Sequence, residues 1–490
     1  MKKKIIMIAA AVVVIVGSVV ALHFVREIDI SPPPPEMPEQ IFILGAPPAT
    51  VLVGETGEEV LGPMPIVDTG VRSVLVTNSY GSFTVWNTGD EHIASNFMLE
   101  GFEDVDVNRS GIIGIANRAQ RLNASRVIEE PGANLADFGL LPPSATADIV
   151  YLSGSTARLL IGNEAPGGNI YVMREGSDTI YLVTRANLNH FLQRDVDFVR
   201  TAITPAGPEG VILFSRAVLG GSERTIIVEE TEPEEGRMFG SHTMTYPTND
   251  RLNHSSVEML MSAFGLVANS VEAKFDSLDE LYKWGLDEPF STLEIESEEF
   301  GIFNLIASSP GSAGPGMVYL VRLGVPIVYR VNVSALPWLE VTSFEMMDRM
   351  IILPFIDSIS TLTVHTADPY QTLVFHLEGE GHDLEVTFNG EQLEDMRQFR
   401  QLFQSLIAAS FESETEEEIP ENANLVMQFI YEYRDGRPSD VVSFYEGAAR
   451  RLFVQLNDGP PMLGLTVYLD LVVANIGRFL AGEPVIIMFF

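Results

Sequence analysis

The sequence contains no cysteine among its 490 residues. This absence excludes disulfide bonds, thiolate metal ligands, iron–sulfur clusters, a cysteine nucleophile and a lipid-modified cysteine near the N-terminus. Basic residues are also scarce, because 30 lysines and arginines stand against 67 aspartates and glutamates, and the formal net charge is −37. A surface that acidic repels phosphate backbones, so we expect no nucleic-acid partner.

The local motifs of common catalytic and metal sites are missing as well. None of the eight histidines stands in an H-x-x-x-H or H-E-x-x-H arrangement, and two isolated histidines make a poor zinc site. Residues 104–108 begin like a calcium loop, but Arg109 and Ile115 replace the required glycine and glutamate. We interpret Asp106 or Asn108 as a helix N-cap. From the sequence we therefore predict no catalytic residue, no cofactor and no metal site.

The N-terminus has the pattern of a membrane anchor. Residues 1–4 form a basic cytoplasmic tail, and an uncharged apolar run covers 5–22, near the lower length of a spanning helix. The positive-inside rule places the rest of the chain outside the cytoplasm, as a single-pass membrane protein. A cleavable secretory signal, which would release the body, is the alternative. Residues 23–69 read as a proline-rich stalk or linker.

A signature occurs twice in the body of the chain. Phe138-Gly139-Leu140 and Trp284-Gly285-Leu286 are each followed by x-x-Pro-x-x-Thr, with Gly285 standing 146 residues after Gly139. Such a self-match at fixed spacing indicates a duplicated structural unit. We expect the glycines at positive φ and the leucines in the core. The signature residues, all given a structural role, are Gly139, Leu140, Pro143, Tyr171, Tyr181, Gly285, Leu286, Pro289, Tyr319 and Tyr329.

Strand-like and helix-like stretches alternate along the exported part. Strand patterns with short Gly-rich connections indicate antiparallel sheets, and a stripe from Met396 to Ile407 predicts an amphipathic helix. The prediction is an α+β fold of tandemly repeated antiparallel sheets with packed amphipathic helices. Its expected divisions are a first repeat region at 70–278, a second at 279–412, and an acidic linker with a C-terminal β-then-α unit at 413–490.

Four elements of the first copy resemble a known bacterial family. They are Leu135-Ala136-Asp137-Phe138-Gly139-Leu140, Leu159 to Asn163, Ile170-Tyr171-Val172 and Ile180 to Val183. Together they are similar to the pattern of the domain-of-unknown-function 4340 family; in the second copy Leu305-Ile306-Ala307 replaces the Ile-Gly element. The resemblance implies an N-terminally anchored, extracytoplasmic protein from a family of which many members are encoded beside ABC-type transporters. It implies no catalytic residues, because none are established for the family.

Two functions remain as hypotheses. The first is a membrane-anchored binding or scaffold protein of the cell envelope, an auxiliary component of an ABC-type transporter complex. The alternative is an exported envelope hydrolase that acts on polymer or peptide. Converging carboxylates or histidines in a cleft would favour the hydrolase, whereas an open groove without such a cluster would favour the binding protein.

Overall fold

The computed structural model describes residues 41–45, 51–53, 59–61, 70–128, 134–221, 224–231, 241–447 and 450–487. The basic tail, the apolar run at 5–22 and most of the stalk lie outside the described residues. The chain divides into two compact units, Met1–Phe198 and Val199–Phe490. In the described part of the chain, no helix has the length and apolar character needed to cross a bilayer.

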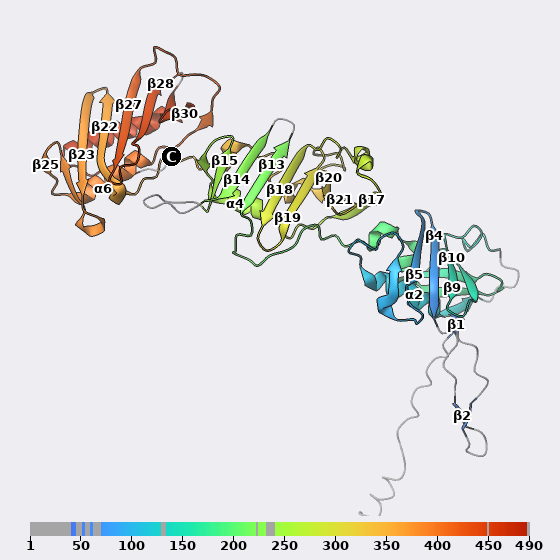
Figure 1. Cartoon of the computed structure of the whole chain (residues 1–490). Helices are drawn as coiled ribbons and strands as arrows, with labels where there is room; N and C mark the ends of the chain where they lie inside the picture. Colours follow the sequence, from blue (N-terminus) through green and yellow to red (C-terminus); the bar gives the residue numbers. More distant parts are fainter. Residues whose placement is uncertain are drawn as a thin grey trace, which may run out of the picture. The chain divides into compact units, whose positions relative to one another are not determined.

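The first unit contains one eight-stranded antiparallel sheet (Figure 1). Its strands alternate buried and exposed side chains. On β4, for example, Val74 and Val76 are buried, whereas Leu75 and Thr77 are exposed. The helix α2 (Arg109–Gln120) contributes Ile112, Ile115 and Ala119 to the core. The strands, in sheet order, are β6 (Phe97–Leu99), β5 (Gly81–Asn87), β4 (Val71–Asn78), β9 (Ala145–Tyr151), β10 (Thr156–Ala165), β11 (Asn169–Arg174), β12 (Ile180–Thr184) and β8 (Arg126–Ile128).

Short elements complete this unit. The strand β7 (Leu122–Ala124) pairs with β1 (Ile41–Leu44), and β2 (Val51–Val53) pairs with β3 (Glu59–Leu61). The remaining helices are η1 (Ala94–Asn96), α3 (Arg185–Leu188), η2 (Asn189–Leu192) and η3 (Asp195–Phe198). The last three follow β12 directly and bring the buried Phe191 and Phe198 to the core.

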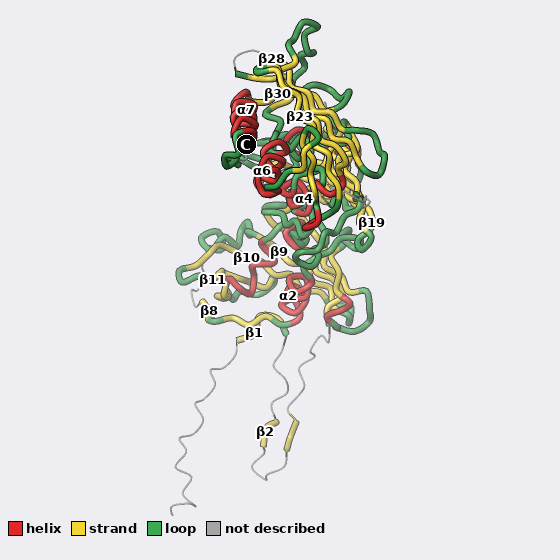
Figure 2. Tube along the Cα trace, turned by 90° about the vertical axis from the view of Figure 1, so that its left-hand side faces the viewer, coloured by secondary structure: helices red, strands yellow, loops and turns green. Residues whose placement is uncertain are grey.

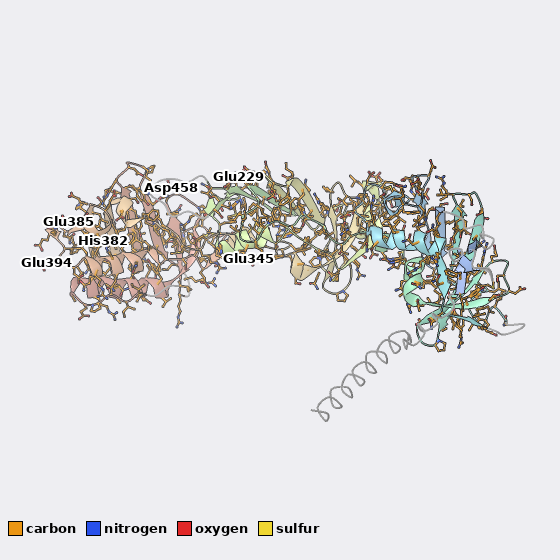
Figure 3. The ribbon with its side chains drawn as sticks, turned by 90° about the horizontal axis from the view of Figure 1, so that it is seen from below. Glu229, Glu345, His382, Glu385, Glu394 and Asp458 are labelled. Carbon is orange, nitrogen blue, oxygen red and sulfur yellow. The ribbon has the colours of Figure 1, made fainter. Side chains whose placement is uncertain are left out.

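The second unit begins with a nine-stranded sheet. Its helices are α4 (His254–Met261), η4 (Leu278–Trp284), η5 (Val333–Ala335) and α5 (Ser343–Met346), and α5 starts with a capping box between Thr342 and Glu345 (Figure 3). The strands, in sheet order, are β16 (Asp250–Arg251), β15 (His242–Tyr246), β14 (Thr225–Glu230), β13 (Arg216–Gly221), β18 (Ser291–Ser297), β19 (Gly301–Ala307), β20 (Met317–Arg322), β21 (Ile327–Asn332) and β17 (Ser270–Lys274).

The same unit ends with a second nine-stranded sheet, the third of the chain. Figure 2 shows α6 (Met396–Ile407) and α7 (Thr466–Leu480) on one side of its strands, and the two helices contact each other. Its short helices are η6 (Ile356–Ser358) and η7 (Gly381–Asp383). The strands, in sheet order, are β25 (Glu391–Gln392), β24 (Glu385–Phe388), β23 (Tyr370–Glu378), β22 (Ile359–Ala367), β27 (Leu425–Tyr433), β28 (Asp440–Glu446), β29 (Arg451–Leu456), β30 (Met462–Leu465) and β26 (Ser413–Glu414).

One strand order runs through all three sheets. A meander comes first, with three strands in the first sheet and four in each of the other two, and it is followed by a helix, an edge strand and a four-stranded meander. The first strands of the two meanders pair with each other: β4 with β9, β13 with β18, and β22 with β27. The edge strand closes the far side on the last strand: β8 on β12, β17 on β21, and β26 on β30. The predicted α+β class with antiparallel sheets is confirmed.

The sheets do not follow the divisions expected from the sequence. The expected boundary between 278 and 279 falls between β17 and β18, which are strands of the same sheet. The region expected as a separate unit at 413–490 supplies β26 to β30, and these complete the third sheet. The physical reason is that β13–β18 and β22–β27 pair across long sequence separations, whereas periodicity reports only local structure.

The helix that follows the first meander of each sheet, α2, α4 or α6, starts in the same way. Asn108 caps α2 by accepting the N–H of Ser110 at 3.2 Å, as the sequence suggested. Asn253 caps α4 by accepting the N–H of Ser256 at 2.8 Å, and Asp395 caps α6 by accepting the N–H of Arg397 at 3.0 Å. A side-chain oxygen at this position satisfies a donor that the helix itself cannot pair. Each helix therefore starts at a fixed point after its meander.

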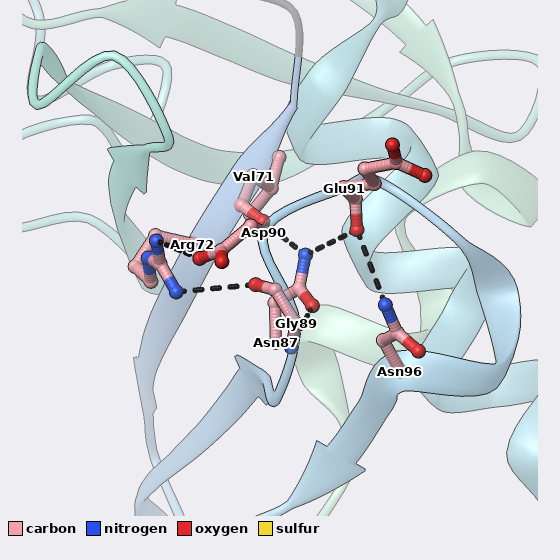
Figure 4. Close-up of polar contacts among 7 residues, drawn as sticks. All are labelled: Val71, Arg72, Asn87, Gly89, Asp90, Glu91 and Asn96. Carbon is pink, nitrogen blue, oxygen red and sulfur yellow. Dashed lines mark hydrogen bonds and ion pairs between the residues drawn. The ribbon is translucent and has the colours of Figure 1, made fainter.

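A buried asparagine organises the connection between β5 and β6 (Figure 4). Asn87, 2% exposed, donates to the carbonyl oxygens of Val71 and Glu91, both at 3.0 Å. Its Oδ1 accepts the N–H of Gly89 at 2.9 Å, and Arg72 donates to the carbonyl of Gly89 at 3.1 Å. Since buried polar groups are costly when unpaired, this network holds the loop against β4.

Candidate binding cleft and signature residues

The aromatic-Gly-Leu signature forms the same turn in both copies, and in the second copy this turn ends η4. Gly139 and Gly285 have left-handed φ values of 65° and 66°. The N–H of Gly139 donates to Ala136 O at 3.1 Å and that of Leu140 to Leu135 O at 2.9 Å. This pair of bonds defines a Schellman motif, in which glycine takes the left-handed position at low cost. The second copy repeats both bonds, from Gly285 to Tyr282 at 3.2 Å and from Leu286 to Leu281 at 3.1 Å.

The leucine that follows each glycine is buried in a matching hydrophobic cluster. Leu140 is 1% exposed and Leu286 is 2% exposed. The clusters correspond residue by residue along the two segments. The first contains Ile128, Leu135, Phe138, Leu140, Leu160, Tyr171, Met173 and Ile180, and the second contains Phe275, Leu281, Trp284, Leu286, Ile306, Tyr319, Val321 and Val328.

The remaining signature residues belong to the strands around these clusters. Pro143 and Pro289 each stand two residues before a strand, β9 and β18 respectively. Tyr171 and Tyr319 lie on β11 and β20, while Tyr181 and Tyr329 lie on β12 and β21. The Tyr171 ring meets Phe138 edge-on at 4.9 Å. One set lies in each compact unit, so the signature residues pack their own cores and do not converge on one site.

The first copy is packed more tightly than the second. A Cβ atom on Gly139 would lie 2.2 Å from Oδ1 of Asn163, and one on Gly162 would lie 2.2 Å from the carbonyl oxygen of Phe138. The N–H of Asn163 donates to that same carbonyl at 2.8 Å. Around Gly285, by contrast, nothing lies within 4 Å of an added Cβ. The turn can therefore approach β10 this closely only because the Ile-Gly element of the first copy has a glycine, Gly162, at the point of contact.

A cleft of about 850 Å³ lies in the second unit. It lies where β14, β15 and β16 meet the turns of the third sheet, and Figure 3 labels Glu229 on β14 and Asp458 beside its lining. Its polar lining is Glu229, Glu230, Thr231, Thr243, Thr245, Thr248, Asn249, Asp250, Arg251, Asp348, Tyr433, Asp440 and Asn457. Its other lining residues are Met347, Met350, Ile351, Ile352, Leu353, Pro354, Phe411, Leu456, Gly459, Pro460 and Met462.

The segment 347–351 holds the two sides of this cleft together. Met347 bridges to Leu252 beside β16, and Met350 bridges to Ser410 beside β26. The N–H of Asp348 donates to Arg251 O at 2.7 Å. The N–H of Ile351 donates to Ala409 O at 3.1 Å, and the N–H of Phe411 donates to Arg349 O at 2.8 Å. Main-chain hydrogen bonds on both sides make this segment a common strand-like floor.

Acidic side chains dominate the charge of the cleft. The lining contains five carboxylates, from Glu229, Glu230, Asp250, Asp348 and Asp440, and one guanidinium, from Arg251. That guanidinium pairs with Asp348 at 3.2 Å and donates to Met350 O at 3.3 Å. Asp440 accepts the Tyr433 hydroxyl at 2.6 Å and the Asn457 amide at 3.1 Å. Glu229 pairs with Arg216 at 3.4 Å.

This arrangement offers hydrogen-bond acceptors, hydroxyl groups and apolar surface to a ligand. Within the described ranges, no three His, Asp or Glu side chains are grouped to hold a metal ion. The cleft was not predicted from the sequence. Its residues come from β14 to β16, the 347–354 segment and two turns of the third sheet. The only local trace is the pair of threonines at 243 and 245, a spacing that is equally typical of an exposed strand.

A buried histidine lies at the start of β15, next to the cleft residue Thr243. His242 is 2% exposed and its ring centroid lies 4.2 Å from that of Phe214. Its Nε2 contacts the carbonyl oxygen of Phe214 at 2.9 Å, and its Nδ1 contacts the Ser241 hydroxyl at 3.1 Å. The carbonyl can only accept, so Nε2 carries the proton in the neutral ring. Burial lowers the pKa of His242, while the Phe214 carbonyl and the charge of Glu230 oppose that shift.

The lowered pKa of His242 predicts a loss of stability on mild acidification. Because the unfolded chain takes up the proton at its ordinary pKa, near 6.5, the folded state is favoured above that pH and loses stability below it. Replacing His242 with glutamine retains a donor for Phe214 O and removes the titration. We expect the unfolding midpoint of the parent protein to fall more between pH 7.5 and pH 5 than that of His242→Gln, in thermal unfolding followed by circular dichroism.

The exposed His254 on α4 provides the control for this comparison. His254→Gln should keep the pH dependence of the parent protein, since its ring lies at the surface beside Glu258. Parallel curves for the parent and His242→Gln across this pH range would contradict the assignment.

The fold and the cleft define a class of protein without naming a reaction: tandem antiparallel α+β sheets of one strand order, with an acidic cleft between two of them. Residues 99–289 match the family model described as Domain of unknown function (DUF4340). This match confirms the resemblance noted in the sequence. No curated protein and no solved structure matches the chain.

Proposed function

We propose that this chain is a binding and scaffold protein built from three copies of one module. A module is one of the three sheets with its packed helix. The single observation that carries the proposal is the strand order shared by the three sheets, with a cleft of about 850 Å³ where two of them meet. Duplicated modules commonly build binding surfaces between neighbours, because each junction adds concave surface without a new fold.

The setting that we propose is the outer side of the cell membrane. Residues 5–22 would form a retained signal anchor and residues 23–69 the stalk, with the modules extracytoplasmic. Tethering holds a binding surface near a membrane partner and raises its effective concentration there. The family resemblance makes a subunit of an ABC-type transporter the partner that we propose.

The absence of cysteine allows a sharp test of orientation and partner contact. Thr245→Cys places one thiol at the exposed edge of the cleft, Glu299→Cys places one in the exposed β18–β19 turn outside the cleft lining, and Lys3→Cys marks the basic tail. A membrane-impermeant maleimide should label Thr245→Cys and Glu299→Cys in spheroplasts, but Lys3→Cys only after lysis. A photoactivatable maleimide at Thr245→Cys should then cross-link one membrane transport subunit that Glu299→Cys does not reach.

Two results would contradict the proposal. Labelling of Lys3→Cys alone in spheroplasts would reverse the orientation. Equal cross-linking from both body positions would remove the cleft as the contact site. A mature form beginning near residue 22 would support the cleaved-signal alternative, which keeps the chain outside the membrane but releases the tether.

The carboxylates of the cleft favour one second candidate, an exported hydrolase acting on envelope polymer or peptide. Asp440 is the most defined of them, with the Tyr433 hydroxyl at 2.6 Å. If the protein hydrolyses such a substrate, Asp440→Asn should abolish turnover while the bound substrate is retained. Unchanged turnover in Asp440→Asn would exclude this residue as a catalytic acid or base.

A further inference from the structure

We infer that the ligand of the cleft is a short, extended peptide segment rich in lysine or arginine and alternating with apolar residues. This inference rests on the proposed binding function and names the chemistry of its partner. Five carboxylates against one guanidinium set the charge of the lining, and that guanidinium is already paired with Asp348. A cationic segment therefore has complementary charge, whereas phosphate groups and anionic headgroups are repelled.

Two of the carboxylates are placed to receive incoming cations. Glu230 ends β14 at an exposed position, and Asp250 lies on the edge strand β16. Neither forms an ion pair with another described residue, unlike Glu229 and Asp348, which pair with Arg216 and Arg251. Rim charges of this kind govern the association rate and its salt dependence.

The apolar half of the lining suits the stems and neighbours of such basic side chains. Met347, Met350 and Met462 lie beside Ile351 and Leu353 on the floor of the cleft. Methionine adapts its shape to varied apolar groups, and the aliphatic stems of lysine and arginine pack on apolar surface while their charged ends stay in water. The carboxylates of the lining thus suit the basic residues of an alternating segment, and the apolar residues of the lining suit its apolar residues.

The size and the polar lining favour an extended segment over a folded domain. About 850 Å³ lies within the ordinary range for ligand clefts, roughly 300–1,000 Å³. Four threonines line the cleft: the hydroxyls of Thr231 and Thr243 bond each other at 2.7 Å, and Thr245 and Thr248 add hydroxyl groups that can donate and accept hydrogen bonds. An extended backbone presents both kinds of group at every residue, which such a lining can satisfy.

The test uses the full-length protein in detergent micelles and two labelled peptides. A fluorescein-labelled decapeptide of alternating lysine and leucine is the probe, and the same peptide with glutamate in place of lysine is its counterpart. Fluorescence anisotropy should detect binding of the lysine peptide alone, weakening as sodium chloride is raised from 50 to 300 mM. The double variant Glu230→Lys/Asp250→Lys should weaken binding by about tenfold or more, because two attractive contacts become repulsive.

A charge-matched control separates the cleft from the overall acidity of the chain. Glu175→Lys/Asp178→Lys changes the net charge by the same amount in the exposed β11–β12 turn of the first unit, and should leave the affinity within about twofold of the parent. If the first double variant fails to fold, as judged by circular dichroism, Glu230→Gln/Asp250→Asn replaces it with a smaller expected loss. Equal weakening by both double variants would overturn the inference.

Other results of these experiments would change the interpretation of the cleft in different ways. Binding of the glutamate peptide with equal affinity, or salt-independent binding, would overturn the role of charge. Displacement of the lysine peptide by millimolar calcium chloride at constant ionic strength, lost in Glu230→Gln/Asp250→Asn, would make the cleft a cation site instead. Specific cross-linking at Thr245→Cys together with failure of the peptide would leave the proposed function standing and reject only this ligand chemistry.

Discussion

Replacing Leu140 with alanine is expected to lower the free energy of unfolding of the first unit by about 2–5 kcal/mol, and Leu286→Ala should do the same in the second unit. Both leucines are almost fully buried and pack with the aromatic residue and the strand residues of their own clusters. Alanine would leave a cavity that a Schellman turn fixed by two main-chain hydrogen bonds cannot collapse to fill.

Hydrogen exchange followed by mass spectrometry can assign each loss to its unit. In Leu140→Ala, protection should fall in β9 to β12 and remain at the parent level in β18 to β21, and Leu286→Ala should give the reverse pattern. The matched control is Leu141→Ala, the next residue in the chain, which is 64% exposed and should change stability by less than about 0.5 kcal/mol. Full stability of both variants with loss of partner binding would give the signature a functional role instead.

Local signals in the sequence were enough to predict these turns. Glycine adopts a left-handed φ at low cost. The glycine that follows the aromatic residue in both copies of the signature, Gly139 and Gly285, therefore predicted this conformation. The stripe of Phe399, Leu402, Phe403 and Leu406 predicted α6, whose apolar face is buried. Each of these predictions depended on residues within one or two turns of one another.

The extent of each sheet could not be predicted in this way. The acidic stretch around 412–421 looks like a linker, yet it contains β26 and is followed by β27, and both strands belong to one sheet. Pairing over long sequence separations places them there: β26 pairs with β30, and β27 pairs with β22, with Leu362 opposite Tyr431 and Val364 opposite Phe429. Cross-strand packing of this kind leaves no periodic trace in the sequence.

The cleft escaped prediction for a related reason. Glu230, Arg251, Asp348 and Asp440 are remote in sequence, and 67 acidic residues make any single carboxylate uninformative. What brings these four residues together is the hydrogen bonding of residues 347–351 to both Arg251 and Ala409. That segment contains no repeat or motif that would mark it as a junction. A site assembled by tertiary pairing becomes visible only when the pairing is known.

Replacing Trp338 with alanine is expected to destabilise the second unit by about 3–5 kcal/mol. The indole is fully buried, and it follows η5 in a loop between the second sheet and α5. Three carbonyl oxygens of that loop, from Trp338, Leu339 and Val341, accept hydrogen bonds from the Arg224 guanidinium at 3.3, 2.9 and 2.6 Å. Loss of the indole would open a cavity beneath this loop and loosen the oxygens that the guanidinium needs.

The electrostatics of Arg224 make this loop sensitive to such loosening. Burial lowers the pKa of Arg224, and the charge of Glu340 partly offsets that effect. The guanidinium also donates to the Ser291 hydroxyl at 2.6 Å, which ties the loop to the first residue of β18. A partly buried charge that loses its acceptors costs more than the hydrogen bonds themselves. We therefore expect the loss in Trp338→Ala to lie near the upper end of the range.

Trp338→Phe separates the cavity from the polar atom of the indole. The Nε1 of Trp338 has no hydrogen-bond partner among the described residues, so its removal breaks no bond and relieves an unpaired buried donor. Phenylalanine keeps most of the aromatic volume, and we expect it to cost less than half as much as alanine. Urea unfolding at 25 °C measures both variants, and hydrogen exchange in β18 to β21 assigns the loss to the second sheet. Equal destabilisation by phenylalanine and alanine would contradict this account, because a phenyl ring would then replace none of the packing that the indole provides.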